Sequence, residues 1–231
     1  MDFEQPEPVL IQERRLIKTM ITGKPGKDSF LIAVMTVFMM GLITLFYWRD
    51  PFGWSQYLPA IKDEVFAHGQ LWRIFTALFI HADLGHYLSN MYMLSVFSFF
   101  IFGYFGFTIY PLTSFLVAAF VNLLAIATYS PDVRLLGASG LVYVLGGFWL
   151  TMYFLIQRQY KWLNRTLRVV GISFMIFAPS TFVPNTSYRT HALGFAAGII
   201  MAFVYFYKNR QIIRSHEVYS VSFVEARPTF H

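Results

Sequence analysis

A serine and a histidine, far apart in the chain, have the surroundings of a nucleophile and its general base. Ser139 lies in the motif Gly137-Ala138-Ser139-Gly140, and His191 stands at the start of another apolar stretch. A serine hydroxyl becomes nucleophilic when an imidazole within hydrogen-bond reach takes its proton. No carboxylate stands in an obvious position to orient His191. The two residues therefore predict a Ser-His dyad rather than a triad.

Two further polar residues have the chemistry to stabilise the negative charge that such an attack creates. His86 and Asn90 are four positions apart, so they share one face of a helix. A side-chain donor to an oxyanion typically contributes about 3 kcal/mol of transition-state stabilisation. The backbone N–H of Ser139 would add to these donors, because free N–H groups at a helix N-terminus favour negative charge.

Small residues indicate how the segments that carry Ser139 and His191 approach each other. Gly194 and Gly198 share a face with His191, and a Gly-x-x-x-Gly spacing permits close backbone contact between membrane helices. Tyr143 follows Ser139 by four positions and is expected to pack against the imidazole of His191.

The elements that must position these residues are membrane helices. Hydrophobic residues make up 56% of the chain and charged residues 13%, about half the charged share of an ordinary globular domain. Charged residues are absent from 29–48, 84–131, 135–157, 169–188 and 190–207. A membrane helix needs about 20 mostly apolar residues, so 84–131 holds two spans, with a break between Gly103 and Pro111, and each other gap holds one. The six expected helices cover about 30–48, 86–105, 110–128, 139–157, 168–183 and 190–207.

Basic residues set the expected orientation of this all-α integral membrane protein. Lys and Arg cluster before the first span, between the fourth and fifth spans and after the sixth. The positive-inside rule places these clusters, and both termini, on the cytoplasmic side. The net charge of +6 thus reflects topology rather than a nucleic-acid partner. Helices 2, 4 and 6 then begin on the opposite side, which brings His86, Asn90, Ser139 and His191 into one layer near the outer leaflet.

The chain divides into a cytoplasmic tail over 1–28, a six-helix domain over 29–207 and a second cytoplasmic tail over 208–231. The first 28 residues lack the apolar core of a signal peptide. The long first loop, 49–85, mixes charges with aromatic residues that favour the membrane–water interface, so we expect it to lie partly in the membrane; a merely amphipathic connector is the alternative. For His81, near its end, two roles stay open: shaping the site or bonding to loop backbone.

These residues together resemble the rhomboid proteases, in order and on the expected spans over about 30–207. The counterparts are Trp72-Arg73 for the W-R motif of the first loop, His81 for a histidine found in many members, His86 and Asn90 for H-x-x-x-N, Gly137 to Gly140 for G-x-S-G, Tyr143 for the tyrosine four residues after the serine, and His191, Gly194 and Gly198 for the catalytic histidine and its following glycines. We expect Arg73 to bind loop carbonyls and Trp72 to sit at the interface.

The resemblance implies a rhomboid-like bundle that acts as an intramembrane serine endopeptidase without metal or other cofactor. Ser139 would attack a peptide carbonyl and His191 would accept its proton. The implied partners are transmembrane protein substrates, cut near the extracytoplasmic side, and membrane lipid. The compact six-span layout, without a targeting peptide or added helix, predicts a bacterial inner membrane.

Two other classes of protein remain alternatives. Rhomboid-like proteins include inactive members that bind transmembrane clients, but these usually lack the serine or the histidine, and both are present here. A transporter would use His81, Asp83 and His86 as a metal or proton site. That interpretation leaves Ser139 and His191 unexplained.

Overall fold

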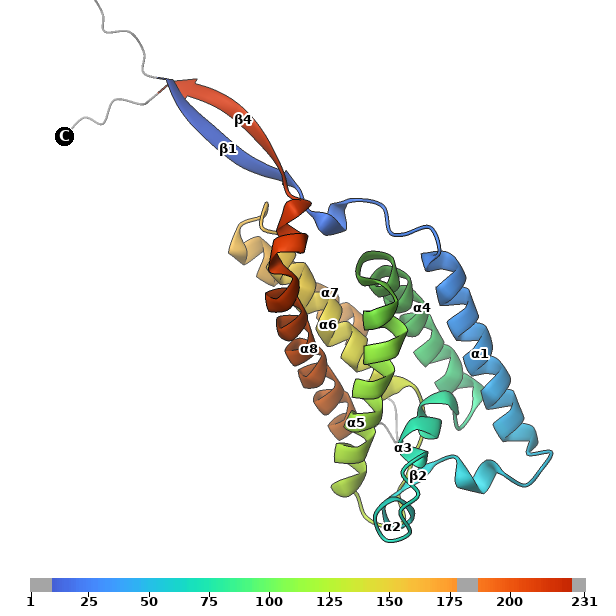
Figure 1. The fold of residues 1–231 in the computed structure, drawn as a ribbon. Coiled ribbons are helices and arrows are strands. Elements are labelled where there is room, and N and C mark those ends of the chain that lie inside the picture. The colour runs from blue at the N-terminus through green and yellow to red at the C-terminus, as the bar shows by residue number, and fades with distance from the viewer. Residues whose placement is uncertain (1–9, 178–186, 226–231) are drawn as a thin grey trace, which may run out of the picture.

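The protein is a bundle of helices that run roughly side by side (Figure 1). The computed structural model describes residues 10–177 and 187–225. The long helices in this part of the chain are α1 Ser29–Arg49, α4 Leu84–Phe107, α5 Ser114–Ala127, α6 Ser139–Ile156, α7 Trp162–Phe177 and α8 Tyr188–Ser215. The predicted all-α membrane bundle is confirmed.

Four segments of the described chain are long and apolar enough to cross a membrane: Ser29–Arg49, Leu84–Ala127, Ser139–Ile156 and Tyr188–Ser215. The second of these has 44 residues and contains both α4 and α5. At about 1.5 Å per residue a straight helix of that length would measure roughly 66 Å, about twice the thickness of the hydrocarbon core. One crossing cannot accommodate it, so the chain must turn within it.

The turn lies where glycine and proline interrupt the apolar pattern. Gly106 has a φ of 75°, a left-handed conformation that glycine adopts without the steric cost of a Cβ atom. A π-helical turn, η4 Thr108–Thr113, follows with Pro111 inside it and leads into α5. The predicted break between Gly103 and Pro111 is confirmed.

Two helices extend further into charged sequence than the apolar gaps indicated. α7 begins at Trp162 rather than near residue 168, and α8 continues to Ser215 rather than ending near residue 207. Lys and Arg are good helix formers, so a helix can continue past the apolar segment that marks the membrane. Residues 178–183, the expected end of the fifth span, lie outside the described residues, and the count of six spans stays a prediction.

α6 forms the centre of the bundle and packs against α4, α5, α7 and α8. Its side chains Leu145 and Phe148 are fully buried. α1 lies at the edge of the bundle and packs on α4, where Tyr87 Oη donates a hydrogen bond of 2.9 Å to Val37 O. The packing thus surrounds the helix that begins with Ser139 and leaves α1 with a single long helical neighbour.

Glycines bring α6 and α8 into backbone contact. A Cβ atom at Gly198 would lie 2.1 Å from Val144 O, and one at Gly147 would lie 2.3 Å from Phe195 O. Any larger residue would push the helices apart, and small residues at contact positions are a general feature of packed membrane helices. The predicted close approach of the helices that carry Ser139 and His191 is confirmed.

The connection from α1 to α4 is folded rather than extended. It contains η2 Ser55–Tyr57, β2 Ala60–Ile61, α2 Lys62–Phe66, α3 Arg73–Thr76 and η3 Ala77–Phe79. β2 pairs antiparallel with β3 Arg134–Leu135, just before the Gly137 motif. Arg73, 3% exposed, donates to Gln56 O at 2.8 Å and Pro59 O at 3.0 Å, while Trp72 is 54% exposed. Arg73 thus binds loop carbonyls as expected, and the interfacial position of Trp72 stays a prediction.

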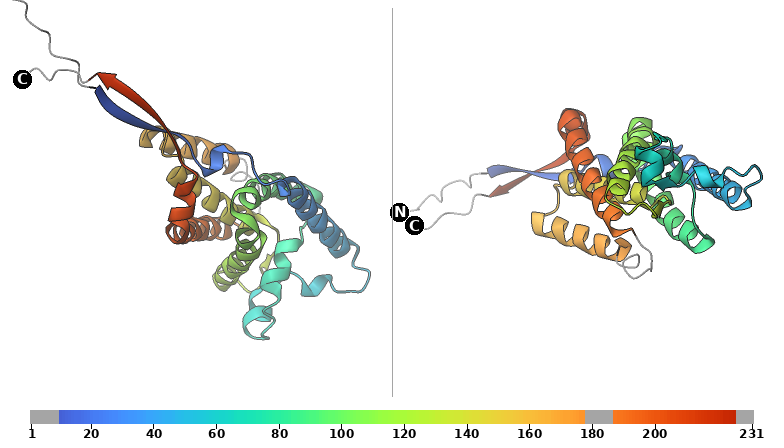
Figure 2. Two further views of the ribbon diagram at one scale, coloured as in Figure 1. Left: turned by 45° about the horizontal axis from the view of Figure 1, so that its top comes forward. Right: turned by 90° about the horizontal axis from the view of Figure 1, so that it is seen from below.

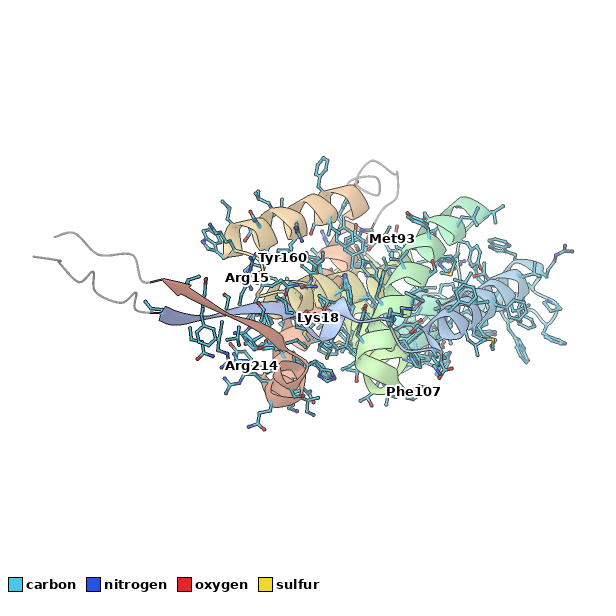
Figure 3. The ribbon with its side chains drawn as sticks, turned by 90° about the horizontal axis from the view of Figure 1, so that it is seen from above. Arg15, Lys18, Met93, Phe107, Tyr160 and Arg214 are labelled. Carbon is cyan, nitrogen blue, oxygen red and sulfur yellow. The ribbon has the colours of Figure 1, made fainter. Side chains whose placement is uncertain are left out.

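A two-stranded ribbon joins the two terminal segments (Figure 2). β1 Leu10–Lys18 pairs antiparallel with β4 Val218–Glu225, and the short helix η1 Met20–Thr22 follows β1. Lys18 and Arg214 lie where the ribbon meets the bundle (Figure 3). The ribbon falls within the segments predicted as tails. Its two strands are far apart in the sequence, so no local pattern predicted their pairing.

Candidate active site

The Gly137 motif enters α6 through a turn that requires glycine. Gly137 has a φ of 112°, and its N–H donates to Ala77 O at 2.8 Å. A Cβ atom at this position would lie 2.6 Å from His86 Cε1. Ala138 is the N-cap of α6, and Ser139 is its first helical residue. The imidazole of His86 therefore packs directly on the turn that presents Ser139.

The start of α4 carries two side chains toward this turn. Asp83 caps the helix and its Oδ1 accepts a 2.8 Å hydrogen bond from the N–H of His86. One helical turn later, Asn90 is 7% exposed, and its Nδ2 is buried without a hydrogen-bond partner among the described residues. This Nδ2 lies 3.7 Å from where a Cβ of Gly137 would be. A buried amide donor is therefore available beside the turn.

His191 lies on α8, against the face of α6 that follows Ser139. Its ring stacks on that of Tyr143, with ring centroids 4.0 Å apart and an interplanar angle of 12°, and it is 8% exposed. The packing of Tyr143 on the imidazole is as expected. No hydrogen bond joins Ser139 Oγ to His191 among the described residues. Such bonds are often long without substrate and shorten in the Michaelis complex.

Residues around the start of α8 fix the position of His191. Arg189 Nη1 donates to Thr128 O at 2.6 Å, and Tyr129 shares a hydrogen bond with Ser187. Thr190 is 1% exposed, and its Cγ2 lies 3.1 Å from where a Cβ of Gly140 would be. The glycine after Ser139 thus lets α8 approach. Sequence reasoning missed these anchors, although Thr190 beside His191 was a polar signal at membrane depth.

His81 is fully buried and bonds the turn from the other side. Its Nε2 accepts a hydrogen bond of 3.3 Å from the N–H of Ala138, and its Nδ1 lies 3.0 Å from Thr44 Oγ1. Burial, and to a smaller extent the neighbouring His86, lower the pKa of His81 to about 3 against the opposing effect of Asp83. With both ring nitrogens bound to protein, His81 bonds the backbone of the turn and is not placed to ligate a metal ion.

The structure brings the predicted residues together from three helices and the linker before α4. His86, Asn90 and His81 surround the turn at Gly137 and Ala138, and His191 stacks one helical turn beyond Ser139. Gly194 supports this arrangement, since a Cβ there would lie 2.7 Å from Gly140 O. The arrangement places a hydroxyl, an imidazole and buried N–H donors at one end of the bundle, which suits acyl transfer.

Comparison with known proteins identifies a family. The model of the family described as Rhomboid domain matches residues 68–208, which is more than half of the chain. The matched range contains the whole site, from His81 to Gly198, and excludes α1. No curated protein matches the sequence.

Proposed function

The chain belongs to the rhomboid family, and on this premise we propose that it is an intramembrane serine endopeptidase with a Ser139–His191 dyad. The observation that carries the proposal is the unpartnered Nδ2 of Asn90, buried beside the turn that presents Ser139. Buried donors without a partner are rare and costly, so one beside a nucleophile serves an acceptor that arrives with the substrate.

The proposed reaction begins when Ser139 Oγ attacks the carbonyl carbon of the peptide and His191 takes the hydroxyl proton. The carbonyl oxygen becomes an oxyanion, which accepts hydrogen bonds from Asn90 Nδ2, the His86 ring and the Ser139 N–H. Collapse of this intermediate breaks the C–N bond, and His191 returns the proton to the leaving amine. Water, activated by His191, then hydrolyses the ester and frees Ser139.

The substrates of this reaction would be transmembrane proteins, because the nucleophile opens a membrane helix. With both termini cytoplasmic, as the basic clusters favour, the N-termini of α4, α6 and α8 face the extracytoplasmic side and cleavage occurs there. We assign the protein to a cell membrane of the bacterial inner-membrane type, surrounded by lipid.

The test is cleavage of a fluorescent transmembrane substrate by purified protein in liposomes. Ser139→Ala and His191→Ala are each expected to abolish cleavage. Ser114→Ala is the control, because Ser114 also opens a membrane helix, α5, but lies away from the site; Ser114 is buried, whereas Ser139 is half-buried. Cleavage that survives Ser139→Ala would refute the dyad, and association with substrates without cleavage by the wild type would support a client-binding protein instead.

A further inference from the structure

α1 lies outside the matched family domain, yet two of its side chains bond the linker that touches the site. Thr44 Oγ1 lies 3.0 Å from His81 Nδ1 and 3.1 Å from Phe79 O, and Trp48 Nε1 donates to His81 O at 2.7 Å. Thr44 is 1% exposed and His81 is fully buried. These are buried polar groups in an apolar region, and each of them has partners.

The partners determine where the protons are. The N–H of Ala138 can only donate, so His81 Nε2 must accept and the ring must carry its proton on Nδ1. Nδ1–H then donates to Thr44 Oγ1, whose own proton goes to Phe79 O. A neutral imidazole satisfies this chain and an imidazolium does not. Each hydrogen-bonding atom between Thr44 and Ala138 is thereby assigned as a donor or an acceptor.

This series of hydrogen bonds, from Thr44 through His81, ends at the backbone N–H of Ala138, the residue before Ser139. Ala138 is the N-cap of α6, where no helical acceptor is available for its N–H. The turn is also held to the linker by a backbone hydrogen bond from the Gly137 N–H to Ala77 O. Loss of the His81 acceptor would leave the Ala138 N–H buried and unpaired, and the turn would move to find another partner.

We propose that Thr44 and His81 are positioning residues for the active site, so that α1 fixes His81 and His81 fixes the Ala138–Ser139 peptide. The inference rests on the proposed function, because its purpose is to hold the nucleophile and its oxyanion donor in place. Neither residue touches the substrate. Both act through the backbone of the turn.

Thr44→Val tests this role, because valine keeps the shape of threonine and removes the hydroxyl. We expect kcat to fall roughly 10- to 100-fold with KM unchanged, since small misplacements of reacting groups have effects of this size. Thr44→Ser, which keeps the hydroxyl, should restore kcat. The matched control is Thr36→Val, at another position on α1. The Thr36 hydroxyl donates to Ile32 O and accepts from Tyr110 Oη, and valine removes both hydrogen bonds.

Thr36→Val is expected to lower the unfolding midpoint without changing kcat. If Thr44→Val and Thr36→Val have the same kcat at temperatures well below unfolding, the positioning role is refuted. His81→Gln offers a second test, because its Oε1 can reach the Ala138 N–H. It should retain more kcat than His81→Asn, whose side chain is too short.

A readout independent of activity separates this inference from the proposed function. Nitrogen-15 NMR of histidine-labelled protein should show His81 as the Nδ1–H tautomer, and Thr44→Val should shift its Nδ1 resonance while Thr36→Val should not. A different tautomer would overturn the inference even if the protein cleaves substrates. Failure of the wild type to cleave any substrate or to react with a serine probe would overturn the proposed function. The NMR result would still decide whether the hydrogen bonds from Thr44 through His81 to Ala138 exist.

Discussion

At the scale of single residues, the site is defined by which buried donors have acceptors. The N–H groups of Gly137 and Ala138 are bonded to Ala77 O and His81 Nε2, whereas Asn90 Nδ2 is buried without an acceptor among the described residues. The turn is therefore held by bonded groups, and the donor without an acceptor is the one that we propose for the oxyanion. On this proposal His81 positions the turn, whereas Asn90 contacts the reacting atoms.

Asn90→Ala is expected to lower kcat by about 10²- to 10³-fold, the usual cost of one oxyanion donor. The unfolding midpoint should change little, because Nδ2 has no hydrogen-bond partner among the described residues to lose. Asn122→Ala is the contrast: its Nδ2 donates to Ile74 O at 2.9 Å, so its removal should destabilise the fold by about 1–3 kcal/mol. Steady-state kinetics and thermal unfolding check both, and an unchanged kcat for Asn90→Ala would contradict the assigned role.

His81 predicts a pH dependence of stability. Its pKa is about 3 in the folded protein, below the ordinary value of 6.5, so the unfolded chain binds this proton more readily. Its contribution is therefore fully present above pH 6.5 and is lost as the pH falls toward 3. The unfolding midpoint of the wild type should fall more steeply over this range than that of His81→Gln. Parallel curves would show that His81 is not buried as a neutral group.

Sequence reasoning found Ser139, His86, Asn90 and His191 because polar side chains in apolar segments stand out. It did not find Thr44. A threonine within a membrane helix is usually a packing residue, and the partner of Thr44 lies 37 positions away across a folded loop. Only the three-dimensional structure shows that contact.

At the scale of elements, the contact between α6 and α8 sets how closely Ser139 and His191 approach each other. The backbones touch at Gly147, Gly194 and Gly198, and the Tyr143–His191 stack lies at one end of the same contact. The spacing of the glycines predicted this contact because it repeats on one helix face. Charge gaps predicted the apolar spans but not the helix ends, since α8 continues through Lys208 and Arg214.

Gly198→Val is expected to abolish cleavage although residue 198 lies two helical turns beyond His191. A Cβ there would lie 2.1 Å from Val144 O, so α8 must shift and carry His191 away from α6. Gly171→Val on α7 is the matched control, because a Cβ at Gly171 would have no atom within 4 Å. Cleavage by reconstituted protein measures both, and equal activity of the two variants would show that this contact does not position the dyad.

At the scale of the whole molecule, the ribbon of β1 and β4 bears on the side of the membrane at which the two termini lie. The pairing of β1 with β4 brings together the segments before α1 and after α8, as the predicted common side of the two termini requires. A common side needs an even number of crossings, and the predicted count of six meets this condition with α7 as one of the six. The charge pattern predicted a common side for the termini, but no local pattern could predict that they pair.

Engineered cysteines test the ribbon, because the natural chain contains none. Glu13 and Ser222 are register partners, so Glu13→Cys combined with Ser222→Cys should form a disulfide on mild oxidation. Glu13→Cys combined with Val218→Cys is out of register and should not. Gel mobility before and after reduction reports the bond. Equal cross-linking of the two pairs would contradict the strand register.

The measurement that tests the central claim most directly is labelling by a fluorophosphonate probe, with the modified residue identified by mass spectrometry. We predict a single adduct, on Ser139, whose formation is abolished in His191→Ala and slowed in Thr44→Val. Labelling of another serine, or labelling of Ser139 that is unaffected by His191→Ala, would contradict the Ser139–His191 dyad.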